Sequence, residues 1–367
     1  MQSVRARVIH TVLISLSVLL SSLLATSALA QHYQQTNLTS NVSGKAPVID
    51  EHHKNPWGLA RSASSFWWIS NNGDGTSSTF TGQGQIGPLR VTIPPPPGQD
   101  GPSAPTGVVF NGSTDFAVTP GNPAAFIWVT EDGTIAAWNP NVNPQSAILK
   151  VNNSPNAVYK GVTIAEIGKK RFLYVSNFNS GMIEIYDTNF QRVQTGRNVF
   201  FDARIPRGFA PFNVQAVGTN LYVTYAQQDT QRHDDVAGAG LGFVDVFSPA
   251  GILLARLEHG SWMNAPWGVV LTPADFGEFS HAVLIGNFGD GSIAAFNPVT
   301  GAFMGNLQNP DGTVLKIDGL WALGFGNDAN AGSALTLFFT AGINDEKDGL
   351  FGTLSPVAAE RNEGDEP

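Results

Sequence analysis

Short apolar segments alternate with polar turns along most of this chain. Representative segments are residues 66–70, 126–130, 172–176, 221–225, 283–286 and 335–340. They are rich in β-branched and aromatic residues, and turns of Gly, Asn and Asp follow them, which is typical of β-strands. No long segment with helical periodicity competes with them. The pattern predicts a protein built almost entirely of short strands.

A motif that begins with Asn55-Pro56-Trp57-Gly58 returns in related form near residues 104, 158, 210, 265 and 318. The third residues of the six copies lie 49, 54, 52, 55 and 53 positions apart; they are Trp57, Thr106, Lys160, Phe212, Trp267 and Leu320. A near-constant period indicates a repeat architecture. Four short strands in each unit of about fifty residues are typical of a propeller blade.

We therefore predict an all-β fold, a six-bladed β-propeller of four-stranded antiparallel blades. The sixth copy, residues 320–354, has three clear strands, and an unpaired strand is predicted at residues 33–39. We expect this N-terminal strand to complete the sixth sheet and to close the ring, since closure removes exposed sheet edges. Two insertions interrupt the repeat, at residues 93–107, with four consecutive prolines, and at residues 226–240.

The first thirty residues have the pattern of a signal peptide. Arg5 and Arg7 precede an apolar run over residues 12–24, and Ala28-Leu29-Ala30 is a small-x-small cleavage site. A retained anchor is the alternative, but the run is short and broken by serines. We expect residues 1–30 to be removed, 31–356 to form the propeller and 357–367 to be a disordered acidic tail. The mature protein would be secreted or periplasmic, without a membrane association.

Composition narrows the functional classes. The 40 glycines, 23 prolines and 42% hydrophobic residues suit an all-β protein with many turns. The absence of cysteine excludes thiolate catalysis, redox pairs and cysteine-bound zinc. Charged residues make up only 13% and are mainly acidic; removing residues 1–30 takes the net charge from −9 to −11. Without a basic patch, nucleic acid is not an expected partner. We expect a monomer.

Polar turns should gather at one mouth of the ring. In an antiparallel blade, the loop that enters the first strand and the loop that joins the second and third strands lie on the same face. The candidate ligand-binding residues in these loops are Asn71, Asp74, Glu131, Asp132, Asn179, Asp229 and Asp290. Their oxygen atoms suit a hard cation such as calcium. The alternative is plain turn chemistry, because Asn, Asp and Gly are common turn residues.

The insertion at residues 226–240 carries the candidate catalytic residues His233, Asp234 and Asp235. A histidine beside carboxylates is a candidate general base. An exposed loop histidine is the alternative, since no nucleophile accompanies it. Trp57, Trp267 and Trp321 either stack on a ligand near the axis or pack between blades, and packing is the favoured interpretation.

Residues 130–135, 233–240 and 286–291 carry a resemblance to a known family. The chain resembles a mostly bacterial, uncharacterised family of exported six-bladed propellers with NHL-like repeats, over residues 33–354. It is distantly similar in fold to calcium-dependent lactonases of the gluconolactonase type. That similarity implies a calcium ion at the axis, held by Glu131, Asn177, Asn287 and Asp345, although no local motif supports the assignment.

The expected function is the binding of a small polar ligand or a cation at the mouth lined by Asn, Asp and Glu. Calcium is the one cofactor expected, and whether the protein is an enzyme stays open. A calcium-dependent hydrolase or lactonase is the first alternative, in which the ion polarises a carbonyl and His233 or an aspartate moves the proton. An extracellular protein-interaction scaffold is the second.

Overall fold

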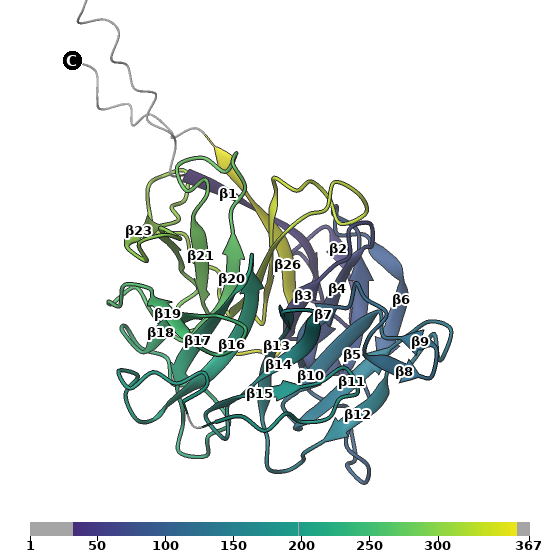
Figure 1. The fold of residues 1–367 in the computed structure, drawn as a ribbon. Helices are drawn as coiled ribbons and strands as arrows, with labels where there is room; N and C mark the ends of the chain where they lie inside the picture. The colour runs from purple at the N-terminus through teal and green to yellow at the C-terminus, as the bar shows by residue number, and fades with distance from the viewer. Residues whose placement is uncertain (1–31, 197, 358–367) are drawn as a thin grey trace, which may run out of the picture.

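The computed structural model describes residues 32–196 and 198–357 and shows a six-bladed β-propeller, as predicted (Figure 1). The predicted signal peptide and residues 358–367 of the predicted tail lie outside this part of the chain. Blade one comprises β3 (Pro56–Ala60), β4 (Trp67–Asn71), β5 (Thr76–Phe80) and β6 (Ile86–Thr92). Blade two comprises β7 (Pro105–Phe110), β10 (Phe126–Thr130), β11 (Thr134–Trp138) and β12 (Ile148–Asn152).

The next three blades follow in chain order. Blade three comprises β13 (Tyr159–Ile167), β14 (Lys170–Asn177) and β15 (Met182–Tyr186). Blade four comprises β16 (Phe209–Val217), β17 (Asn220–Gln227), β18 (Gly242–Phe247) and β19 (Leu253–Arg256). Blade five comprises β20 (Pro266–Leu271), β21 (Val283–Asn287), β22 (Ile293–Phe296) and β23 (Phe303–Asn306).

Blade six joins the two ends of the described chain. It comprises β24 (Leu320–Phe325), β25 (Leu337–Ala341), β26 (Leu350–Val357), β1 (His32–Ser40) and β2 (Val48–Ile49). Figure 1 shows β1, in purple, beside β26, in yellow, and their antiparallel ladder pairs Tyr33 with Pro356. The buried hydroxyl of Tyr33 donates a hydrogen bond to the carbonyl of Phe276 in blade five. The predicted closure of the ring by the N-terminal strand is confirmed.

Two blades differ from the predicted number of four strands, and two small elements are added to the ring. Among the described residues, blade three has a three-stranded sheet, and a single bridge, between Tyr186 and Arg192, stands where its outer strand would run. Blade six gains a fifth strand, since β2 pairs in parallel with the outer side of β1. A small hairpin, β8 (Ala117–Thr119) with β9 (Asn122–Pro123), adds to blade two, and a short 3-10 helix, η1 (Asn72–Asp74), follows β4. Neither alters the ring.

The first strand of every blade carries a break in register close to its start. Such a bulge turns an extra side chain away from the regular alternation. The residues at the break are all buried: they are Trp57, Thr106, Lys160, Phe212, Trp267 and Trp321. The four aromatic rings among them contact one another across the ring of blades. In blade one, Pro56 pairs with Asn71 at the end of the second strand, and Trp57 follows it in the break. In blade six, Leu320 pairs with Ala341 in the same way, so the residue in the break is Trp321. The sequence pattern placed this copy one residue too early.

In several blades a glycine directly follows the residue at the register break, where neighbouring blades lie close together. A Cβ atom on Gly58 would lie 2.5 Å from the carbonyl oxygen of Thr106, and one on Gly268 would lie 2.7 Å from that of Trp321. Both distances are shorter than any packed carbon can adopt. The glycines of the repeat therefore set the spacing between blades.

Within residues 32–196 and 198–357, no helix has the length and apolarity that a membrane crossing requires.

Candidate functional site

Side chains from several blades meet at the mouth formed by the loops before the first strands and after the second strands. Asn72 of blade one donates a hydrogen bond of 2.7 Å to Glu131 of blade two. Asn55 of blade one donates a hydrogen bond of 2.8 Å to Glu346 of blade six. These contacts join residues 59 and 291 positions apart in the chain. The loops therefore converge at one end of the axis, as antiparallel geometry requires.

Lys160 lies at the centre of this group, in the break at the start of β13. Its side chain is 1% exposed, and its Nζ binds Oε1 of Glu131 in an ion pair and lies 3.5 Å from Oδ1 of Asp234. Burial by itself lowers the pKa of Lys160, but the facing carboxylates, above all Glu131, outweigh burial and hold that pKa above its ordinary value. The ammonium is therefore charged and already paired.

An aromatic layer closes the channel beneath Lys160. Trp57 stacks on Trp321 with ring centroids 3.4 Å apart and meets Trp267 edge-on at 5.9 Å. The Nζ of Lys160 lies 5.1 Å from the centroid of the Trp57 ring, which is within the range of a cation–π interaction. These tryptophans are buried, so they pack the axis and do not present a stacking surface to solvent, which confirms the favoured interpretation.

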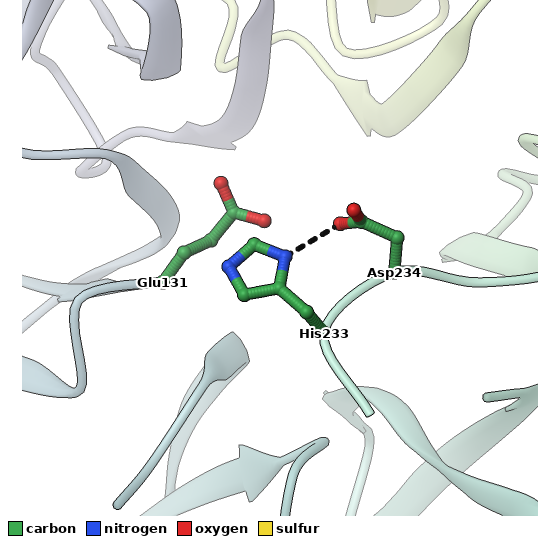
Figure 2. A group of neighbouring side chains, drawn as sticks. All are labelled: Glu131, His233 and Asp234. Atoms are coloured by element: carbon green, nitrogen blue, oxygen red, sulfur yellow. Dashed lines mark hydrogen bonds and ion pairs between the residues drawn. The ribbon is translucent and has the colours of Figure 1, made fainter. Parts of the chain in front are cut away.

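His233 and Asp234 reach the same place from the loop between β17 and β18 (Figure 2). The ring Nδ1 of His233 lies 2.8 Å from Oδ1 of Asp234, and ligating atoms of His233, Asp234 and Glu131 all lie within 4.8 Å of one another. The hydrogen bond from His233 lowers the pKa of Asp234 to about 2, and the same bond raises the pKa of His233. The two side chains therefore favour each other's charged forms.

Asp235 and Glu346 add two further carboxyl groups. Burial raises the pKa of Asp235 to about 7; the charge of Lys160 opposes this shift and the charge of Glu346 adds to it. Burial also raises the pKa of Glu346, although the hydrogen bond from Asn55 opposes the shift. Three consecutive residues, Asn344, Asp345 and Glu346, have a left-handed backbone with φ of 58°, 53° and 61°. Such a run is strained and occurs where the surrounding structure fixes it.

The site holds the carboxyl groups of Glu131, Asp234, Asp235 and Glu346, and its cations, Lys160 and His233, are too few to neutralise all of them.

The other candidate ligand-binding residues make local contacts that order their turns. Asn71 donates to Thr76 and Ser78, and Asp74 accepts from Thr76 and contacts His52 at 3.0 Å. Asp132 accepts from the backbone of Ala104 and from Gln99. Asp229 accepts from the backbone of His233, and Asp290 accepts from Ser292 and pairs with Lys316. Asn179 is half-buried beside Phe178. These contacts are those of ordinary turn chemistry.

The four residues proposed for calcium do not fit that ion as the structure places them. The Oδ1 of Asn177 accepts hydrogen bonds from the backbone of Val158 and Ser180, and the Oδ1 of Asn287 accepts one from Asn264. Glu131 is bound to Lys160, and the Asp345 side chain is 94% exposed. Calcium is coordinated by six to eight oxygen atoms, from the protein and from water, and the protein's oxygens must converge on one point with their lone pairs free.

Lys160 and Glu346 also belong to the site, although neither was predicted from the sequence as a site residue. A signal for Lys160 was present, because five of the six repeat positions hold Trp, Thr, Phe or Leu and this one holds a cation. No comparable signal marks Glu346, since its position depends on the strained backbone of its own loop.

The open part of the channel lies on the other side of the aromatic layer. A cavity of about 320 Å³ is lined by the far ends of the first strands, including Leu59, Val109, Val270 and Leu323. Apolar side chains line most of it, but polar atoms, including those of Arg61 and Gln215, supply about half of the surface that faces the cavity. The tryptophans thus separate the charged side chains of the mouth from this cavity.

Comparison with known proteins gives relatives whose sequences match most of the chain. No family model matches it. Two uncharacterized proteins of Acanthamoeba polyphaga mimivirus, R648 and L690, are each 30% identical to it over 329 residues. The alignments cover 86% of this chain and 78% and 84% of the two viral proteins. The chain belongs to the family of these two proteins. Both members are uncharacterized, so this family membership brings no reaction with it.

One solved structure supports the propeller fold of this chain. A streptogramin B lyase structure matches with a TM-score of 0.51 and 11% identity, over 88% of this chain and 97% of the lyase. At this identity the likeness concerns the propeller fold alone. A calcium-binding regucalcin from Agrobacterium tumefaciens matches less well, with a TM-score of 0.47 and 11% identity over 85% of this chain and 94% of its own. That likeness indicates nothing about calcium in this chain.

Proposed function

We propose that the mouth of the channel binds a small polar ligand that carries positive charge, and that the protein does so after export. The proposal of export rests on the signal-peptide pattern of residues 1–30. The proposal of binding rests on the gathering of Glu131, His233, Asp234 and Glu346 from three blades around one buried cation.

The balance of charge at the mouth favours a cationic ligand over an anion. The ammonium of Lys160 is buried and bound, so it is not available to a ligand. The side chain of Asp234 is 67% exposed and accepts hydrogen bonds. The raised pKa values of Asp235 and Glu346 indicate that these carboxyl groups gain too little from neighbouring cations to ionise at their usual pH. An added positive charge stabilises their ionised forms.

An NMR titration of the full chain tests this proposal. The probes are spermidine as the cation, glucose as the neutral polar ligand and citrate as the anion, with the His233 ring as the reporter. We expect spermidine to move the His233 resonances at the lowest concentration and citrate to leave them unchanged. E346Q removes one acceptor charge and is expected to weaken spermidine binding about tenfold. The matched control is D275N, because Asp275 is exposed and lies outside the site. Citrate binding as tightly as spermidine would contradict the proposal.

A divalent cation is the second candidate ligand, favoured by the closeness of Glu131, His233 and Asp234. An imidazole with two carboxylates suits Zn²⁺ or Mn²⁺ better than Ca²⁺, which prefers oxygen ligands. The charge of Lys160 opposes such an ion and lowers its affinity. Calorimetry with ZnCl₂ and CaCl₂ separates the two proposed ligand sets: D234N should abolish zinc binding, and D345N should leave it unchanged. Calcium binding that is lost in D345N would restore the set predicted from sequence.

A further inference from the structure

The axial cavity on the far side of the aromatic layer contains none of the residues of the mouth. It has a volume of about 320 Å³ and lies where the first strands of blades one, two, five and six end, at the opposite end of the axis. Trp67, Phe110 and Phe325 are the aromatic residues among those that line it. An apolar cavity of about 150 Å³ accepts benzene, so this one has room for two fused rings.

Among the described residues that line this cavity, Arg61 is the only charged one. It is half-buried, and its guanidinium forms no ion pair with a carboxylate of residues 32–196 or 198–357. Burial lowers the pKa of Arg61, and the charge of the exposed Asp328 opposes this shift from beyond the distance of an ion pair. An arginine nevertheless keeps its charge in a folded protein. The wall of the cavity therefore holds a partly desolvated cation without a paired anion.

Two contacts hold the Arg61 side chain in place and leave part of it free. Its Nε donates a hydrogen bond of 2.6 Å to the carbonyl of Phe325 in blade six, and its guanidinium carbon lies 5.6 Å from the centroid of the Trp67 ring. Its Nη1 makes only a long contact of 3.5 Å with the carbonyl of Ser62. Its Nη2 donates to no residue that the structure describes, and protein atoms do not enclose it. A fixed guanidinium with free N–H groups suits a carboxylate, which accepts charge-assisted hydrogen bonds from it.

The polar part of the cavity surface limits the ligand further. Gln215 of blade four also lines the cavity, and its Nε2 makes only a long contact of 3.5 Å with the carbonyl of Ala216. Polar atoms supply about half of the surface that faces the cavity, so a pure hydrocarbon would leave them without partners. No aspartate or glutamate of the described chain lines it, so a cationic group finds no anion there. These features favour an anion that carries an apolar ring.

We propose that this end of the channel binds a small aromatic carboxylate. The carboxylate accepts hydrogen bonds from the Arg61 guanidinium, and the ring packs among Trp67, Phe110 and Phe325. A neutral aromatic compound fills the same space but leaves Arg61 without a partner. The ligand has the opposite charge to the one proposed for the mouth, so the proposal does not depend on binding there.

Calorimetry of the full chain tests the proposal with three probes. 2-Naphthoate has the ring and the charge, 2-naphthamide has nearly the same shape without the charge, and acetate has the charge without the ring. We expect 2-naphthoate to bind at least about tenfold more tightly than either analogue. R61M should lower the affinity for 2-naphthoate to that for 2-naphthamide and leave 2-naphthamide binding unchanged. The matched control is R207M, because Arg207 is exposed and lies outside the cavity, and it should bind as the wild type does.

A second variant tests the space and keeps the charge. Val270 is half-buried and lines the cavity, so V270F should fill part of it and weaken 2-naphthoate binding at least about tenfold. Melting temperatures show which variants remain folded, and the three probes decide the matter on the wild type alone if neither does. The proposal is overturned if 2-naphthoate produces no heat at millimolar concentration or if 2-naphthamide binds as tightly. Acetate that binds as tightly would show an adventitious ion only, and a folded R61M that binds 2-naphthoate like the wild type would also overturn it.

Discussion

The ammonium of Lys160 in blade three pairs with the carboxylate of Glu131 in blade two, at a position where four of the other five blades place aromatic rings on the axis. Lys160 is 1% exposed and Glu131 is 13% exposed. Because both groups are largely removed from water, each charge is stabilised mainly by the other. A pair of this kind is costly to break from one side, because the remaining charge stays buried.

K160M should therefore destabilise the fold by about 3–5 kcal/mol, although methionine keeps the packing against Trp57. The loss arises from the unpaired carboxylate of Glu131. Urea denaturation measures it, and the double variant K160M/E131Q should lose less than K160M alone. If K160M is as stable as the wild type, the pair does not contribute as described.

G58A tests the spacing between blades one and two. A methyl group at this position would meet the Thr106 carbonyl at 2.5 Å, so the two sheets must separate or distort. Overpacking of this kind costs about 1–3 kcal/mol. The control is G196A, because nothing lies within 4 Å of a Cβ at that position. Thermal unfolding should show a lower midpoint for G58A and an unchanged one for G196A; equal midpoints would show that the contact is not limiting.

D245N should raise the free energy of unfolding, and the gain should depend on pH. The pKa of Asp245 is about 8 in the folded protein and about 3.9 in an unfolded chain, so the folded state holds the proton more tightly. The wild type therefore loses stability as the pH rises from about 4 to 8. The asparagine side chain of D245N has no carboxyl proton to lose, so the advantage of this variant grows over that range to the order of a few kcal/mol. Denaturation at pH 4, 6 and 8 measures this; an advantage that is constant with pH would contradict the burial of an uncompensated carboxylate.

The sequence predicted the ring well because its period is carried by backbone requirements. Four of the six copies carry a proline directly before the residue at the register break, and glycine stands where blades touch, so the motif recurs and can be counted. The sixth copy lacks both the proline and the glycine that follows the break, and its register was placed one residue too early, at Leu320 instead of Trp321. Blade three was predicted to have four strands, but its outer segment pairs through one bridge only.

The site was harder to predict, because the same residue types, Asn, Asp and Glu, occur in a turn whether the side chain binds a ligand or the backbone of its own turn. Glu131, His233 and Asp234 were identified and lie together. Asn177 and Asn287 look equivalent in sequence, but their amides serve their own blades. Only the rotamer decides between these uses, and the rotamer depends on neighbours distant in sequence. Lys160 shows the reverse case, an apolar repeat position that holds a charge.

The pKa of His233 tests most directly whether the side chains of blades two, three and four form one site. NMR titration of its ring protons gives this pKa, and an H233Q spectrum assigns the resonance. The wild type should titrate above the ordinary value of about 6.5, chiefly because of Asp234. E131Q should lower the pKa of His233, since a nearby anion is removed, and K160M should raise it, since a nearby cation is removed. An identical pKa in all three proteins would show that these residues do not share a site.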